Sequence, residues 1–234
     1  MNKILVIKLG GSIISKSDDL LFDFDYLKKF YNSLNKLIKQ DYKFFVVVGG
    51  GFVMRKYRDL VKQGGITEDS QIHWIGTAIN NLNAEIVRAA MSDICGDRIF
   101  AYEDYYKEEK ILFSKPVIIG GAGRAGHSGD VDAVLIAKRL GVQTIISLKN
   151  IDAVYSSDPR IEPEAQKLKD VTWEKYLDVI GTNEHLPGAN FPIDPIASAD
   201  AQKSNKKFII ISGYDLLNFE NVVLGLDFKG STVY

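Results

Sequence analysis

The chain has 234 residues, of which 46% are hydrophobic and 25% charged, and its formal net charge is −1. This length suits one large domain, or two closely merged ones, with a sizeable core. A nearly neutral chain gives no electrostatic reason to expect nucleic acid or a membrane surface as a partner. The single cysteine, Cys95, excludes an internal disulfide framework and a cysteine-rich metal site. No stretch approaches the ~20 apolar residues of a membrane span or the pattern of a signal peptide, so we expect a cytoplasmic protein.

Apolar runs alternate with helical patterns along the chain. In the first half we predict a strand at 3–9, a helix at 23–39, a strand at 43–48, helices at 52–63 and 79–92, and a strand at 115–121. In the second half we predict a helix at 130–141, a strand at 143–148, helices at 172–181 and 194–205, a strand at 207–213, a helix at 216–225 and a strand at 231–234. Residues 64–76 and 181–192 are the expected long loops.

The predicted strands are continuously apolar rather than alternating, and helices separate them. This pattern favours a largely parallel sheet that is covered on both faces. Asp194 followed by Pro195 is typical of a helix start.

Three of the predicted strands end in glycine: Gly10–Gly11, Gly49–Gly51 and Gly120–Gly121. Each alone is explained by a turn from strand to helix, but together they indicate a polyphosphate site at the carboxyl edge of the sheet. Lacking Cβ, Gly50 and Gly51 would let bare backbone approach a phosphate, and a methyl group at Gly50 would then obstruct it. No G-x-x-x-x-G-K-[ST] loop is present and no G-x-G-x-x-G follows a strand, which argues against a Walker-type or dinucleotide site.

Several motifs together carry a family resemblance. "KLGGS" (8–12), "VVVGGGFVMRKY" (46–57), "LNA" (82–84), "GHSGD" (126–130), "NIDAVYSSDPR" (150–160), "IDPIA" (193–197) and "KGSTV" (229–233) occur in matching order. The chain resembles the amino acid kinase superfamily, and within it the archaeal-type uridylate (UMP) kinases. The resemblance implies an α/β fold, a three-layer αβα sandwich with a mainly parallel central sheet. It also implies a single domain over 1–234, in which about 1–140 bind the phosphoryl acceptor and about 141–234 bind ATP.

The resemblance further implies ATP-dependent phosphoryl transfer, with Mg²⁺, to a small phosphate-bearing acceptor. UMP is the best guess, which would place the protein in pyrimidine biosynthesis, and a homo-oligomer, a hexamer built from dimers, is expected. Two alternatives stay open. One is the same fold acting on another nucleotide, an alkyl phosphate or a carboxylate. The other is a nucleotide-binding oxyanion storage protein, comparable to the molybdenum storage proteins of this superfamily.

The resemblance assigns catalysis to Lys8 and Asp130. Lys8 would place a cation on the transferring phosphate, and Asp130 would orient that lysine from a position that also suits a helix N-cap. The residues expected to bind ATP are Gly10, Gly11, Ser12, Gly51, Arg55, Lys149, Tyr155 and Asp158. Arg55 is otherwise a solvated helix arginine, and Tyr155 and Asp158 are otherwise parts of a turn.

The acceptor side departs from the family pattern. The residues expected there are Gly50, His73, Gly123, Arg124, Gly126, His127, Ser128 and Gly129. His73 stands where the family has an aspartate, although Asp69 lies one helical turn earlier and is a possible substitute. Asn80 and Asn81 replace a threonine and an arginine, Gly129 replaces a threonine, and the loop after Gly121 is one residue longer.

Some of these residues also have simpler interpretations. His73 is equally well explained as a structural histidine, and Arg124 as a solvated loop arginine. Asp132, an acid without a clear family counterpart, either binds Mg²⁺ or only favours the positive end of its helix. We therefore assign no metal ligand from the sequence.

Overall fold

A seven-stranded sheet forms the centre of the protein in the computed structural model, which describes residues 3–181 and 191–234. The strand order across the sheet is β3-β2-β1-β4-β8-β9-β7. These strands are β1 (Lys3–Leu9), β2 (Tyr42–Val48), β3 (Val117–Gly120), β4 (Thr144–Lys149), β7 (Asp170–Val171), β8 (Lys207–Ser212) and β9 (Ser231–Val233). Only the pairing of β8 with β9 is antiparallel within the described part of this sheet, so the predicted mainly parallel sheet is confirmed.

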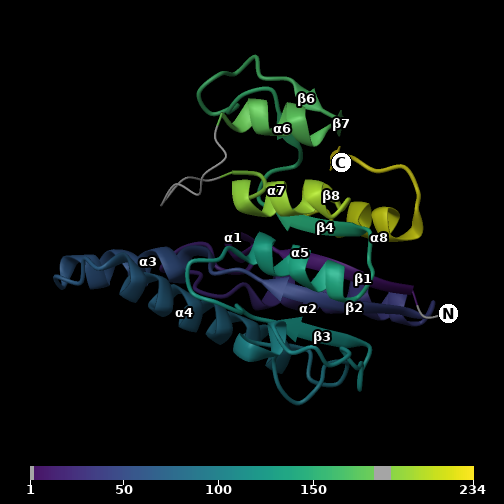
Figure 1. Cartoon of the computed structure of the whole chain (residues 1–234). Helices are drawn as coiled ribbons and strands as arrows, with labels where there is room; N and C mark the ends of the chain where they lie inside the picture. The colour runs from purple at the N-terminus through teal and green to yellow at the C-terminus, as the bar shows by residue number, and fades with distance from the viewer. Residues whose placement is uncertain (1–2, 182–190) are drawn as a thin grey trace.

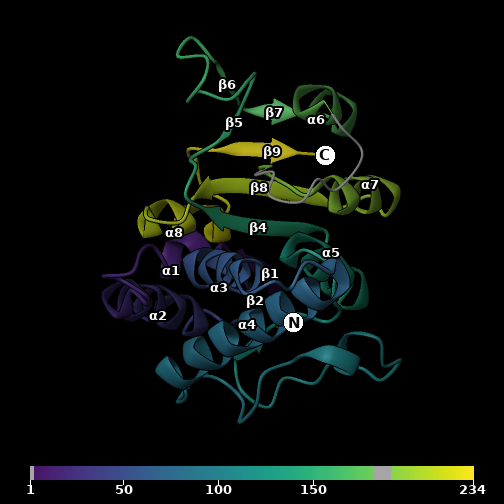
Figure 2. The ribbon, with the colours of Figure 1, turned by 90° about the vertical axis from the view of Figure 1, so that its left-hand side faces the viewer.

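Helices cover both faces of this sheet, which confirms the predicted three-layer sandwich. They are α1 (Gly11–Ile14), α2 (Phe24–Ile38), α3 (Gly51–Gln63), α4 (Asp69–Ala90), α5 (Gly129–Arg139), α6 (Trp173–Ile180), α7 (Pro195–Lys203), α8 (Leu216–Leu224) and the 3₁₀ helix η1 (Tyr102–Tyr105). The sheet is seen with its labelled elements in Figure 1, and Figure 2 shows α2 and α8 on one side of it and α5, α6 and α7 on the other. The short strands β5 (Val154–Tyr155) and β6 (Lys167–Leu168) form a separate antiparallel pair.

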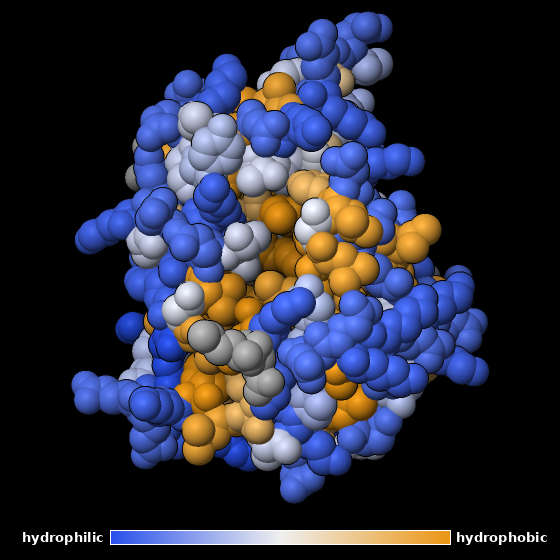
Figure 3. Space-filling view, turned by 90° about the vertical axis from the view of Figure 1, so that its right-hand side faces the viewer, coloured by the Kyte–Doolittle hydropathy of each residue, from blue (hydrophilic) through white to orange (hydrophobic). Residues whose placement is uncertain are grey.

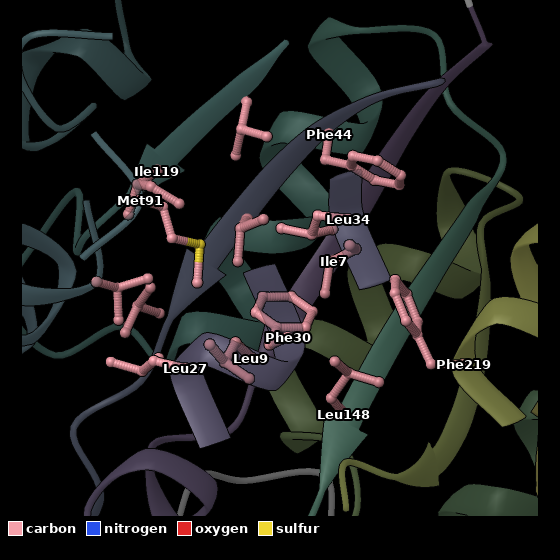
Figure 4. Packing of buried hydrophobic residues seen from close by; sticks show 14 of the residues in the cluster. Ile7, Leu9, Leu27, Phe30, Leu34, Phe44, Met91, Ile119, Leu148 and Phe219 are labelled. Atoms are coloured by element: carbon pink, nitrogen blue, oxygen red, sulfur yellow. The ribbon is translucent and has the colours of Figure 1, made fainter. Parts of the chain in front are cut away.

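The two faces of the sheet bury separate apolar cores. Figure 4 shows Ile7 and Leu9 of β1 among Phe30, Leu34 and Phe219 from α2 and α8. The opposite face packs side chains of β1, β2 and β4 against α5, α6 and α7. Because both faces are covered, the last five residues of β2 are all buried, which is why the strand is continuously apolar in sequence.

Helix starts follow from side-chain caps that the sequence supplies. The Asp194 side chain accepts hydrogen bonds from the backbone N–H groups of Ile196 and Ala197, with Pro195 in the first turn of α7. This confirms the predicted start of that helix. Gly181 and Gly225 adopt the left-handed conformation at the ends of α6 and α8.

Two predictions about local structure are wrong. Residues 69–76, which we expected in a loop, form the first two turns of α4. Ile72 among them and the next residue along, Thr77, are buried in spite of the polar sequence around them. The helix cap of α5 is Ser128, whose side chain accepts from the N–H of Val131, and Asp130 lies inside the first turn instead. Most of the other expected loop, 182–190, lies outside the described residues.

Candidate active site

The glycine-rich strand ends lie at one edge of the sheet. β3, β2 and β1 are adjacent and parallel, with Val47 opposite Gly120 and Val48 opposite Leu9. The backbone N–H of Gly49 donates to the carbonyl of Leu9 at 3.0 Å, so the first two glycine turns begin side by side. The prediction that three glycine turns share one edge is therefore confirmed.

The glycines at this edge are packed against one another. A Cβ on Gly11 would lie 2.1 Å from the backbone nitrogen of Gly51, and a Cβ on Gly51 would lie 2.3 Å from the carbonyl oxygen of Gly11. Gly51 also has a φ of +63°. Both positions thus require glycine so that the turns after β1 and β2 can meet.

The expected role of Gly50 needs correction. A Cβ on Gly50 would lie 2.5 Å from Oδ1 of Asn80 and 2.5 Å from Cβ of Met54. It would point into α3 and α4, not toward a ligand beyond the edge. The glycine is explained by close packing of the protein against itself, and our expectation that a methyl group there obstructs an acceptor phosphate is wrong.

Two lysines from neighbouring strands converge on Asp130. Nζ of Lys149, at the end of β4, lies 3.2 Å from Oδ2 of Asp130, and Nζ of Lys8, in β1, lies 3.6 Å from Oδ1. The backbone N–H of Asp194 also donates to Oδ2 of Asp130 at 3.2 Å. The structure therefore brings together Lys8, Asp130 and Lys149, from both sides of the predicted boundary near residue 140.

Burial and mutual attraction set the charges of this cluster. Burial raises the pKa of the Asp130 carboxyl, but Lys149, Lys8 and the Asp194 N–H outweigh this effect and hold the pKa below its usual range. Burial lowers the pKa of Lys149 to about 8; Asp130 opposes this effect and the charge of Lys8 adds to it. Two ammonium groups around one carboxylate form a partly desolvated positive centre, which suits a phosphate group.

The edge continues into the first turns of α1 and α3. Nη1 of Arg55 donates to Oγ of Ser12 at 3.3 Å, which joins two residues that we expected at the ATP phosphates. Burial is the main reason why the pKa of Arg55 is lowered from its ordinary value. A half-buried arginine held across the two glycine turns favours the phosphate-binding interpretation over a solvated helix arginine.

The expected adenosine contacts lie in a different segment. Tyr155 lies in β5 and donates through its hydroxyl to Oδ1 of Asp152 at 2.8 Å. Asp158 pairs with Arg160 at 2.6 Å. These contacts, and the approach of the Lys167 ammonium group in β6 to the Tyr155 ring, hold the segment together.

The expected acceptor residues occupy the loop before α5 and the start of α4. Gly126 has a φ of +81°, and a Cβ there would meet open space, whereas Gly129 packs beside Lys8, with a Cβ position 3.4 Å from Cε. His127 is half-buried, and burial followed by the charge of Arg124 lowers its pKa. His73 is half-buried in α4, where its carbonyl accepts from Thr77.

Three residues of this region make contacts that our sequence interpretation did not assign. Nδ2 of Asn83 donates to the carbonyls of Gly49 at 3.0 Å and Gly50 at 2.8 Å, so the "LNA" motif fastens the glycine turn. Asn81 and Asp132 contact the loop after β3. The motif around Asn83 was a signal for a structural role, but no local pattern pairs Asn81 or Asp132 with that loop.

The described residues include no group of three or more His, Cys, Asp and Glu side chains that could hold a metal ion. In the same part of the chain, no helix is both long and apolar enough to cross a membrane. The donor set at the edge, with ammonium groups, a guanidinium and glycine backbone, fits the phosphates of a nucleotide.

The chain belongs to the amino acid kinase family, whose model matches residues 3–212. It is 31% identical over 221 residues to the uridylate kinase of Thermococcus onnurineus, which covers 94% of this chain and 95% of that relative. It is 28% identical over 229 residues to the uridylate kinase of Pyrococcus abyssi, covering 98% of each. The crystal structure of uridylate kinase from Archaeoglobus fulgidus superposes with a TM-score of 0.81 at 25% identity, covering 99% of this chain and 100% of that one.

A more distant structure, the UMP kinase from Bacillus anthracis, has a TM-score of 0.76 at 19% identity and covers 99% of this chain and 95% of its own. It supports the fold alone. Together, the family model and the archaeal relatives confirm the resemblance that the motifs predicted.

Proposed function

We propose that the protein is an ATP-dependent phosphotransferase that phosphorylates a small phosphate-bearing acceptor, with UMP as the first candidate and UDP as the product. The observation that carries this proposal is the convergence of Lys8 and Lys149 on Asp130 beside the glycine edge. The archaeal relatives described as uridylate kinases support UMP as the acceptor.

The chemistry of phosphoryl transfer matches this arrangement. The transition state spreads negative charge over the transferring phosphoryl oxygens, so catalysis depends on positioning and on fixed positive charge. Lys8 would stabilise that charge, and Asp130 would hold Lys8 and Lys149 in place. Because both lysines sit on strands of the central sheet, their ammonium groups need little reorganisation during the reaction.

The proposed ATP site consists of the glycine turns after β1 and β2 and of the C-terminal part of the chain. Gly10, Gly11, Ser12, Gly51 and Arg55 would bind phosphates, and Tyr155 and Asp158 would lie by the adenosine. Mg²⁺ would be bound mainly by the nucleotide phosphates, as is common for kinases, and would neutralise charge on them. On the same grounds we propose that residues up to about 140 mainly bind the acceptor and that the residues after them mainly bind ATP.

The acceptor side would consist of the start of α4 and the loop before α5. Arg124 and His127 supply the polar side chains of this loop, and Gly126 supplies its left-handed turn. His73 would face the acceptor where the family carries an aspartate. This departure favours a second candidate, the same reaction on a different acceptor.

We also propose a cytoplasmic homo-oligomer without a nucleic acid partner. Figure 3 shows hydrophobic residues gathered in the middle of the face opposite to that of Figure 2, among hydrophilic ones. Exposed apolar surface of this kind is typical of an association surface.

A panel of acceptors tests the proposed function. Purified protein is assayed with ATP and Mg²⁺ against UMP, CMP, AMP, GMP, an alkyl phosphate and a carboxylate, with ADP formation as the readout. We expect the highest kcat/KM with UMP. Highest activity with another member of the panel would identify the second candidate, and no transfer to any acceptor would remove the kinase assignment.

A further inference from the structure

The segment Gly121–Ala122–Gly123, which we call the loop base, joins β3 to the proposed acceptor loop at residues 124–128. Each of its residues is held by hydrogen bonds. The N–H of Gly121 donates to the carbonyl of Phe100 at 2.9 Å, and the hydroxyl of Tyr105 donates to the carbonyl of Gly121 at 2.7 Å.

Two side chains from different helices hold the rest of the loop base. The N–H of Ala122 donates to Oδ1 of Asn81 in α4 at 2.7 Å, and the N–H of the next residue, Gly123, donates to Oδ2 of Asp132 in α5 at 3.4 Å. Asn81 is 7% exposed and Asp132 is 1% exposed. Consecutive amides of the loop base are thus bound by two buried side chains.

Asn81 and Asp132 are two of the positions at which the resemblance led us to expect a difference from the family pattern. The resemblance also implies that the loop after Gly121 is one residue longer than in the family. The structure joins these departures, because both side chains bind the segment from which the longer loop starts. A Cβ on Gly121 would lie 2.0 Å from Oδ1 of Asn81, so the amide side chain fits closely against the glycine.

Both ends of the proposed acceptor loop are attached to α5, the helix that carries Asp130. Ser128 caps α5 at the far end of the loop, and Gly123 is bound to Asp132 at the near end. Asp132 lies two residues after Asp130, which binds Lys8 and Lys149. A shift of the loop base would therefore move the loop relative to the cluster that we propose to act on the phosphate.

Among the described residues, the carboxylate of Asp132 uses only one of its two oxygens in a hydrogen bond. Its Oδ1 atom is fully buried and has no hydrogen-bond partner among the described residues. No cluster of three metal-ligating side chains includes it there. Its other oxygen, Oδ2, accepts the hydrogen bond from the loop base.

We propose that Asn81 and Asp132 are positioning residues that fix the loop base and thereby set affinity and selectivity for the acceptor. This inference rests on the proposed function for its effect on catalysis. Its structural part, the two hydrogen bonds, is independent of any activity. Neither side chain is proposed to contact the transferring group.

Leucine and isosteric variants separate positioning from general stability. Asn81→Leu and Asp132→Leu keep side-chain size but leave the amides of Ala122 and Gly123 without a partner. Asp132→Asn keeps an accepting oxygen, and Phe219→Leu, in the core on the α8 side of the sheet, is the matched control for a buried substitution elsewhere. We expect the two leucine variants to raise KM for the acceptor roughly tenfold or more, with KM for ATP within about twofold of wild type.

The remaining variants make the test specific. Asp132→Asn should restore the acceptor KM to within about threefold of wild type, and the Asn81→Leu/Asp132→Leu double variant should lose less than the product of the two single effects, because both residues hold one segment. Equal changes in both KM values, no change in either, or an Asp132→Asn variant as impaired as Asp132→Leu would overturn the inference. Should Asp132→Leu fail to fold, Asn81→Leu alone decides through the same KM comparison.

A second measurement does not depend on kinase activity. In amide hydrogen exchange, Ala122 should lose protection in Asn81→Leu and Gly123 should lose it in Asp132→Leu, while the Phe219→Leu control keeps both. If the wild-type protein has no kinase activity but the leucine variants lose amide protection as expected, the proposed function is disproved and the two hydrogen bonds to the loop base are still supported. If the protein is an active kinase but the loop-base amides of the leucine variants exchange as they do in wild type, the proposed positioning role of Asn81 and Asp132 is disproved.

Discussion

The ammonium group of Lys149 lies 3.2 Å from the carboxylate of Asp130, although one residue ends a central strand and the other opens a helix. Lys8 approaches the other oxygen of the same carboxylate. Asp130 thus lies between two largely buried cations and offsets part of the repulsion between them. This relationship determines what should follow when any member of the cluster is changed.

Asp130→Asn should lose both activity and stability. The amide is the same size, but it leaves Lys8 and Lys149 without their shared anion, and breaking a buried ion pair commonly costs ~3–5 kcal/mol. We expect kcat to fall ~10²-fold or more and Tm to fall with it. Steady-state kinetics and thermal unfolding measure the two effects, and wild-type values for both would contradict the assignment.

Lys8→Met should mainly affect turnover. Lys8 is nearly buried, with its side chain 13% exposed, and methionine keeps most of the apolar stem. We expect a ~10²-fold or greater loss of kcat with a small change in Tm, because the charge is directed at the phosphoryl oxygens of the transition state. Lys3→Met, at the exposed beginning of the same strand, is the matched control. Retained turnover in Lys8→Met would make the residue a bystander.

Lys149 should give the reaction an alkaline limit. Its pKa of about 8, lowered by burial, means that the free enzyme loses this positive charge as the pH rises through that value. We expect kcat/KM for ATP to fall above pH 8, since the neutral amine no longer attracts phosphate. In Lys149→Arg the guanidinium stays charged, so the alkaline decline of kcat/KM should move to higher pH or disappear. If the arginine variant shows the same alkaline decline as wild type, the decline is caused by the titration of another group.

Part of this site was predictable from the sequence because it depends on strand order and strand ends. Runs of apolar residues that stop at glycine predicted β1, β2 and β3 and the shared edge, and parallel pairing places such ends together. Asp194 and Pro195 predicted the start of α7 because capping acts over a few neighbouring residues.

The contacts that cross the fold were not predictable in this way. Asn81 binds Ala122 across 41 positions of sequence, and no local pattern indicates such a pair. The sequence also does not show in which direction a Cβ on a glycine would point. For this reason we assigned Gly50 to a ligand, although a Cβ there would meet Met54 and Asn80. The start of α4 was missed since its burial depends on packing against other elements and not on its own polar sequence.

Glycine substitutions at the edge should act through folding. Gly11→Ala would place a methyl group 2.1 Å from the backbone of Gly51, and Gly50→Ala would place one 2.5 Å from Met54. Both should lower Tm, Gly11→Ala more strongly because backbone cannot move aside as a side chain can. Gly76→Ala, inside α4 with its nearest contact at 3.9 Å, should instead raise stability by up to ~1 kcal/mol.

Thermal unfolding of the three variants checks this order. Gly50→Ala should change KM for the acceptor and for ATP to a similar extent, if at all. A Gly50→Ala protein with wild-type Tm and a selectively raised acceptor KM would restore the idea that this glycine makes room for a ligand.

Asp132 should make the stability of the protein depend on pH. Burial raises the pKa of its carboxyl from 3.8 to about 7, and the Gly123 N–H opposes that shift only in part. A carboxyl with a raised folded-state pKa contributes stability that is complete below pH 3.8 and is lost as the pH rises to about 7. Above that range the fold carries a buried anion at a cost of at most ~4 kcal/mol. Tyr105 in η1 and Tyr106 just after it interact with Asp132; burial is the main reason why both have raised pKa values, and they stay neutral in this range.

Asp132→Asn removes the titration and keeps an oxygen for the Gly123 N–H. We therefore expect its Tm to exceed that of wild type at pH 8, by roughly 2–4 °C for each kcal/mol recovered, and this advantage to shrink as the pH approaches 5. Asp97→Asn, at an exposed position, should show no such difference between the two pH values. Thermal unfolding at pH 5, 6.5 and 8 measures the trend. An Asp132→Asn protein that is less stable than wild type at pH 8, or equally shifted at every pH, would mean that the buried carboxylate has a cationic or hydrogen-bonding partner that offsets its burial.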